Sequence, residues 1–88
     1  MAWAIEFVPA AAKELKKVGR GEAARIITTL EERIANLDDP RQLGSALTGE
    51  LAGLWRWRIG GYRVIARIED QRVTILVVRV AHRREVYR

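Results

Sequence analysis

The chain has 88 residues, no cysteine and a formal net charge of +5 at pH 7. This length corresponds to a single domain over residues 1–88, and the absence of cysteine excludes disulfides, thiolate metal ligands and a thiol nucleophile. No stretch approaches the roughly 20 apolar residues of a membrane span and no signal peptide is recognisable, so we expect a cytoplasmic protein with no membrane partner.

The first half of the chain predicts one strand followed by two helices. Apolar and polar residues alternate over residues 3–7, which is typical of a short strand, and Pro9 can open a helix as its first residue. Apolar residues at helical spacing continue to about Val18, and Gly19-Arg20-Gly21 ends this helix. A second apolar stripe predicts a helix from about Glu22 to Asn36.

The second half predicts a connection and three strands. Residues 41–53 contain glycines and scattered leucines, so we expect a connecting segment without regular structure. Strands are predicted at residues 54–59, 62–68 and 72–80, with tight turns between them. The order β-α-α-β-β-β predicts an α+β domain in which an antiparallel sheet packs against a helical hairpin.

The positive charge belongs to the second half alone. Residues 1–44 carry seven basic and seven acidic residues, whereas residues 45–88 carry nine basic residues, all arginine, and four acidic ones. A guanidinium group holds a phosphate or carboxylate through two parallel hydrogen bonds, which an ammonium group cannot do. We therefore expect a polyanionic partner.

Arginine and aromatic residues alternate along the first of the three predicted strands. Arg56 and Arg58 are two residues apart and share one face, while the tryptophans beside them lie on the other face and are expected in the core. Arg63 follows the Gly60-Gly61 turn, so antiparallel pairing brings it near this strand. These arginines form a candidate anion-binding face.

The sequence ends in a charged cluster, His82-Arg83-Arg84-Glu85-Val86-Tyr87-Arg88. A catalytic triad or a zinc site is poorly supported, because the only histidine is His82 and its only nearby second ligand is Glu85. RNA, however, carries its own nucleophile, the 2′-hydroxyl. An enzyme acting on RNA then needs only positioning, stabilisation of negative charge and proton transfer, which several arginines with a histidine and a tyrosine can supply.

Two segments resemble the signature sequences of the RelE family, within the RelE/ParE superfamily of toxins of type II toxin-antitoxin systems. They are residues 54–64, LWRWRIGGYRV, and residues 82–87, HRREVY. The chain length and element order are also similar to the family. The resemblance implies a RelE-like fold and an endoribonuclease, without metal or other cofactor, that cleaves mRNA in the A site of the 70S ribosome. It also implies inhibition by a cognate RelB-like antitoxin.

The resemblance implies roles for five residues. Arg56 and Arg58 match two cations that contact the mRNA phosphates around the cut, and Arg63 matches the arginine that stabilises the scissile phosphate. Arg83 matches the arginine that assists the leaving group, and Tyr87 matches a tyrosine that stacks on a base.

The remaining candidates are inferred from chemistry. Histidine ordinarily titrates near neutral pH, so we infer that His82 accepts the 2′-hydroxyl proton, with Tyr87 as the competing base. Arg79 and Arg84 are candidate contacts to RNA phosphates, or else surface residues, and Arg67 is expected to contribute little. Two other functions stay open, namely a ParE-like inhibitor of DNA gyrase and a non-catalytic module that binds antitoxin or RNA.

Overall fold

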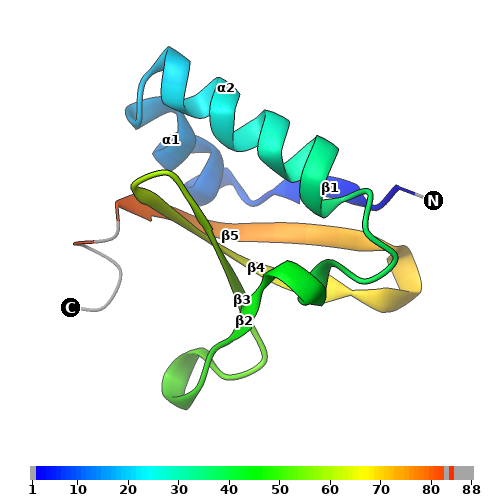
Figure 1. Ribbon diagram of the computed structural model, residues 1–88. Coiled ribbons are helices and arrows are strands. Elements are labelled where there is room, and N and C mark those ends of the chain that lie inside the picture. Colours follow the sequence, from blue (N-terminus) through cyan, green and yellow to red (C-terminus); the bar gives the residue numbers. More distant parts are fainter. Residues whose placement is uncertain (1, 83, 85–88) are drawn as a thin grey trace.

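The computed structural model describes residues 2–82 and 84. Within this range, two helices lie on one face of a five-stranded sheet of order β1-β5-β4-β3-β2 (Figure 1). The helices are α1 (Pro9–Lys17) and α2 (Arg20–Thr29), which continues into a π-helical turn (Leu30–Ile34). The strands are β1 (Ala4–Phe7), β2 (Ser45–Ala46), β3 (Trp55–Ile59), β4 (Tyr62–Glu69) and β5 (Thr74–His82), with 3-10 turns at Pro40–Leu43, Gly49–Leu51 and Asp70–Arg72.

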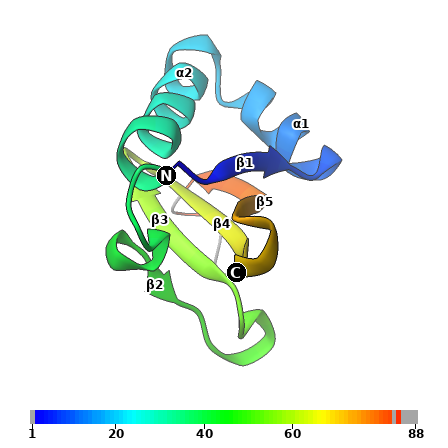
Figure 2. The same ribbon diagram turned by 90° about the vertical axis from the view of Figure 1, so that its right-hand side faces the viewer.

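The predicted α+β class is confirmed, with a mixed sheet. The strands β3, β4 and β5 form an antiparallel meander, but β1 runs parallel to β5, with Ala4 opposite Thr74 and Phe7 opposite Val77. Figure 2 shows β1 beside β5 at one edge of the sheet. Parallel neighbours need a long crossover connection, and the rest of the chain between β1 and β5 supplies it.

The segment that we expected to be irregular, residues 41–53, is partly regular. Its strand β2 is only two residues long and pairs with β3. A strand this short has too few residues to show the alternation from which strands are predicted. The segment is held by Trp57, whose Nε1 donates a hydrogen bond of 3.1 Å to the carbonyl of Pro40. A Cβ at Gly44 would lie 3.0 Å from the same Nε1, so glycine lets the backbone pass close to the indole ring.

The main core lies between the helices and the sheet. Ile26, Leu30 and Ile34, spaced by four, are buried on α2 and its π-helical turn, against strand residues that include Val64 and Trp57. Trp57 is 2% exposed, as the alternation with arginine predicted. Each fully buried aliphatic side chain contributes about 1.5–3 kcal/mol, so this core fixes the strands and with them the opposite face. No helix among the described residues is long and apolar enough to cross a membrane.

The β3–β4 hairpin turns at the predicted glycine pair. Gly60 has a φ of 60°, which glycine adopts without strain, and Ile59 pairs with Tyr62 across the turn. A Cβ at Gly60 would lie 3.2 Å from Nη1 of Arg25 on α2, so the turn packs against this helix. The turn therefore sets both the register of β3 and β4 and their position under α2.

Candidate nucleic-acid interface

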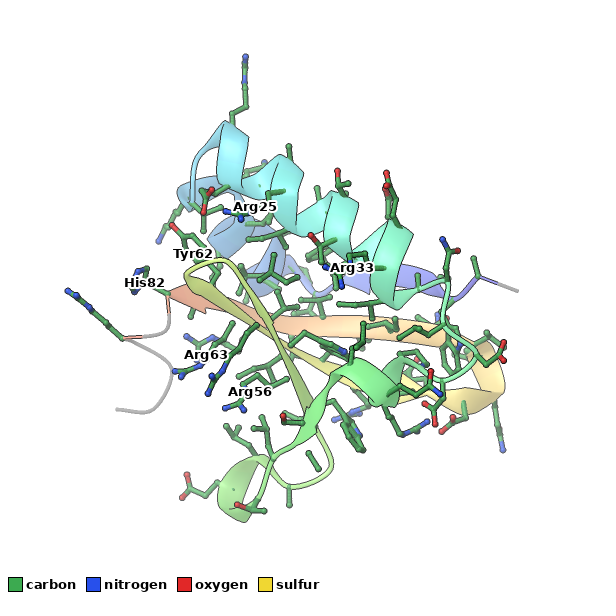
Figure 3. The ribbon with its side chains drawn as sticks, viewed as in Figure 1. Arg25, Arg33, Arg56, Tyr62, Arg63 and His82 are labelled. Atoms are coloured by element: carbon green, nitrogen blue, oxygen red, sulfur yellow. The ribbon has the colours of Figure 1, made fainter. Side chains whose placement is uncertain are left out.

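The sheet face away from the helices, which we call the open face, carries arginines from two adjacent strands. Arg58 lies directly opposite Arg63, and Arg56 lies opposite Ile65. Residues directly opposite in antiparallel strands point to the same face. Figure 3 shows Arg56 and Arg63 on the side of the sheet away from α2. The register thus brings the three candidate arginines together as the alternation and the turn predicted, and their binding roles stay predictions.

Arg58 and Arg63 form a pair of like charges across two strands. Such a pair destabilises a sheet by up to about 1 kcal/mol relative to neutral residues. Arg58 is exposed, whereas Arg63 is half-buried and its Nε is completely buried. A phosphate bound between the two guanidinium groups would replace repulsion by charge-assisted hydrogen bonds. The arrangement is therefore suited to binding an anion.

Two apolar residues on the open face are buried although they lie on the side of the sheet away from α1 and α2. Ile65 is 1% exposed and Ala81, opposite Arg63, is 6% exposed. The aliphatic stem of an arginine can cover apolar surface while its guanidinium group reaches water. Buried apolar residues next to the guanidinium groups lower the local dielectric constant, which strengthens the attraction between these groups and a phosphate.

Other arginines are paired with carboxylates. Arg41 donates hydrogen bonds of 3.1 and 2.8 Å to Asp70, which hold the pKa of the Asp70 carboxyl below its usual range. Arg72 donates to Glu69 and to both carboxylate oxygens of Glu6, and these bonds raise the pKa of Arg72. Two acids of the arginine-rich half are thereby committed to ion pairs around the β4–β5 turn.

Arg79 lies opposite Ile65 of the open face and is also paired with an acid of α1. Its Nε donates a hydrogen bond of 3.0 Å to Glu14, and the other carboxylate oxygen of Glu14 accepts a bond of 2.8 Å from the backbone N–H of Val80. The β4–β5 register shifts here, which leaves Val78 as an extra residue on β5. Such a β-bulge redirects neighbouring side chains, so residue spacing alone could not place Arg79.

His82 lies at the end of β5 against Tyr62, its partner on β4 (Figure 3). The two rings meet edge to face, with centroids 5.5 Å apart. The Nδ1 of His82 accepts a hydrogen bond of 3.3 Å from the backbone N–H of Arg84, so a neutral imidazole in this arrangement carries its proton on Nε2. Nδ1 can accept a proton from a substrate only after its hydrogen bond from the Arg84 backbone N–H is broken.

The structure brings two further cations near the candidate residues, Lys17 and Arg67, the second of which we expected to contribute little. Lys17 of α1 lines a cleft of about 370 Å³ together with Tyr62 and His82, and no sequence spacing connects these elements. Arg67 lies on the open face, because Val64, Ala66 and Ile68 belong to the core on the helix side. The two-residue period of β4 could have shown this.

Two predicted site residues, Arg83 and Tyr87, lie outside the described residues. Arg84 is described and exposed beyond the end of β5. Over residues 2–82 and 84, no group of three or more His, Cys, Asp or Glu side chains could hold a metal ion.

Comparison with known proteins gives a consistent result over nearly the whole chain. Residues 5–87 match the family model described as the ParE toxin of type II toxin-antitoxin system, parDE. The toxin RelG of Mycobacterium tuberculosis is 33% identical over 89 residues, which cover 100% of this chain and 99% of RelG. The toxin RelE of the same organism is 34% identical over 76 residues, which cover 75% of this chain and 78% of that protein.

Solved structures share the fold. The toxin-antitoxin complex RelBE2 from Mycobacterium tuberculosis contains a chain that superposes with a TM-score of 0.85 and 29% identity, over 94% of this chain and 93% of that chain. The isolated RelE toxin of E. coli superposes with a TM-score of 0.71 and 24% identity, over 98% and 92%. The likeness to the E. coli toxin concerns the fold alone.

Proposed function

Because the chain belongs to the RelE/ParE superfamily of type II toxin-antitoxin toxins, we propose that it is a RelE-type toxin that cleaves mRNA in the A site of the ribosome. The observation that carries this proposal is the arginine cluster of the open face, in which Arg58 lies opposite Arg63 with Arg56 on the same strand. A ParE-like inhibitor of DNA gyrase needs no site for a scissile phosphate. The names of the two curated relatives, RelG and RelE, also favour the RelE side of the superfamily.

The chemistry follows from the nucleophile that RNA carries. The 2′-hydroxyl oxygen attacks the adjacent phosphorus, a base takes the hydroxyl proton, and the bond from phosphorus to the 5′-oxygen breaks as that oxygen gains a proton. The products are a 2′,3′-cyclic phosphate and a 5′-hydroxyl. Arg63 stabilises the extra negative charge of the phosphorane, Arg56 and Arg58 hold neighbouring phosphates, and Arg83 assists the leaving oxygen. This chemistry needs no metal or other cofactor.

The ribosome supplies what the isolated domain lacks. A domain with few groups able to exchange protons at neutral pH binds and cuts free RNA poorly, so the A site must hold the mRNA in line for attack. We place this activity in the cytoplasm, where the 70S ribosome and its mRNA are found.

The proposed inhibitor is a RelB-like antitoxin. RelBE2, the complex that contains the structural relative at 29% identity, is a toxin bound to its antitoxin. The arginines of the open face would attract an acidic segment that folds on binding, and the same segment would exclude mRNA phosphates.

Cleavage of mRNA on programmed ribosomes tests the proposal. Mapping of 5′ ends should show cuts in the A-site codon with wild-type protein and far fewer without ribosomes. Loss of a donor aimed at transition-state charge typically costs about 10²–10³ in rate, so Arg63→Ala should nearly abolish cleavage. Arg20→Ala, an exposed position at the start of α2, is the matched control and should keep the wild-type rate.

Two results would contradict this proposal. Equal losses at Arg63 and Arg20 would show general attraction to ribosomal RNA, with no arginine specially placed. Intact mRNA together with gyrase-linked DNA breaks in cells would favour the ParE-like alternative. The family model that matches this chain is that of the ParE toxin, so this alternative is tested as well.

A further inference from the structure

We infer that Arg67 is a further contact to an RNA phosphate, which extends the binding surface along β4 beyond the cut; this inference rests on the proposed function. Arg67 follows Arg63 by four residues on the same strand. Because the residues between core positions Val64, Ala66 and Ile68 face away from the helices, Arg67 shares the open face with Arg63 and Ile65.

The charge of Arg67 is available to a ligand. Its side chain is exposed, and it forms no ion pair with any residue in the described ranges, 2–82 and 84. The acid that shares its strand face, two residues on, is Glu69. That carboxylate accepts from Arg72, which also binds Glu6. Among the residues that the structure describes, the ion pairs of Arg72 therefore leave Arg67 without an acidic partner.

The spacing separates Arg67 from the chemical step. Four residues of strand separate the two Cα atoms by about 13 Å, so where both side chains stand perpendicular to the sheet, Arg63 and Arg67 meet different phosphates. A single-stranded RNA that crosses the open face from Arg63 over the buried Ile65 meets Arg67 with a different phosphate. Positively charged grooves follow an RNA backbone in this way. Arg67 should therefore strengthen binding and leave the rate of the bound complex almost unchanged.

The first experiment measures binding to a short single-stranded RNA that is 2′-O-methylated and cannot be cleaved. Each phosphate contact to a single strand contributes about 0.7 to the slope of log binding constant against log salt concentration. Arg67→Ala should lower this slope by about that amount, whereas Arg67→Lys keeps it. The control Arg20→Ala carries the same charge change on α2 and should leave the slope at its wild-type value. Equal melting temperatures would show that all variants are folded.

The second experiment uses programmed ribosomes. Arg67→Ala should raise KM about threefold to tenfold and keep the single-turnover rate at saturation within about twofold of wild type. An unchanged salt slope, or a loss of saturated rate as large as that of Arg63→Ala, would overturn the inference. Weaker antitoxin binding with an unchanged RNA slope would also overturn it, in favour of an acidic protein segment. If wild-type protein leaves ribosomal mRNA intact, the proposed function fails, and the salt slope still decides the role of Arg67.

Discussion

At the scale of single residues, the arginine pair across β3 and β4 predicts that binding competes with stability. Replacement of Arg58 by Thr removes a cation opposite Arg63 and adds a β-branched residue, so Arg58→Thr should stabilise the fold. We expect a gain of up to about 1 kcal/mol, which corresponds to roughly 4–8 °C in Tm for a domain of this size. Thermal unfolding followed by circular dichroism measures it.

Arg67→Thr is the matched control for this stability prediction. Arg67 lies on the same face but opposite Leu76, so the same substitution there relieves no repulsion and should give a smaller gain. High salt should shrink the difference between the two variants, because it screens the exposed charges. A lower Tm for Arg58→Thr than for wild type would show that the two guanidinium groups do not repel each other in the folded protein.

The second prediction at this scale concerns His82 and Tyr87, the two candidate bases. A base must be unprotonated, so its titration sets the acid-side limb of the rate against pH. We expect His82→Ala to flatten this limb in single-turnover cleavage on ribosomes and Tyr87→Phe to leave it in place. If His82→Ala keeps the wild-type rate and profile, His82 only holds the Arg84 amide and packs against Tyr62.

At the scale of elements, an ion pair ties the 3-10 turn at Pro40–Leu43 to the β4–β5 turn. Hydrogen bonds from Arg41 lower the pKa of Asp70 below its ordinary value of 3.8. A carboxyl with a lowered pKa stabilises the fold above the unfolded-state pKa, and this contribution is lost as the pH falls through the folded-state pKa. Asp70→Asn should therefore be less stable than wild type at neutral pH.

The pH dependence of this difference is the measurement. Urea unfolding of wild type and Asp70→Asn from pH 7 downwards should show a gap that stays constant to about pH 5 and closes below pH 3.8. A gap that persists at pH 2 would mean that Asp70 acts through something other than its charge.

A second ion-pair element, the contacts of Arg72, should influence binding indirectly. Arg72→Ala frees Glu69 to pair with Arg67, two residues away on the same strand face. We expect weaker binding of the uncleavable RNA, and recovery when Glu69→Gln is added to Arg72→Ala. Binding that is unchanged in Arg72→Ala would show that Glu69 does not compete for Arg67.

The sequence predicted the helices and the three longest strands, and it placed Arg56, Arg58 and Arg63 together on the open face. The strands β3, β4 and β5 have a strong two-residue period and lie within about two residues of the predicted bounds. The strand β2 was not predicted, because two residues are too few to show a period. The parallel pairing of β1 with β5 was not predicted either, because the paired residues are far apart in sequence. The ion pair between Arg79 and Glu14 was not predicted, because it depends on how β4, β5 and α1 pack together.

At the scale of the whole molecule, the helices and the arginines of the open face come from different halves of the chain. Both helices come from the electrically balanced half, whereas the arginines of the open face come from the half that carries the whole +5. A molecule charged on one side turns that side towards a polyanion during approach, and salt slows this association. The same side then serves for attraction and for binding.

The position of β5 has a consequence for the synthesis of the protein. Of the described strands β5 is translated last, yet it lies between β1 and β4 inside the sheet. The strand β1 pairs with residues about 70 positions away in sequence, for example Ala4 with Thr74. Such distant pairings form late in folding. A nascent chain that lacks β5 can pair β2, β3 and β4, but its arginine-bearing hairpin has no strand that joins it to β1. The ribosome that makes this protein therefore meets the complete five-stranded sheet only once β5 has emerged.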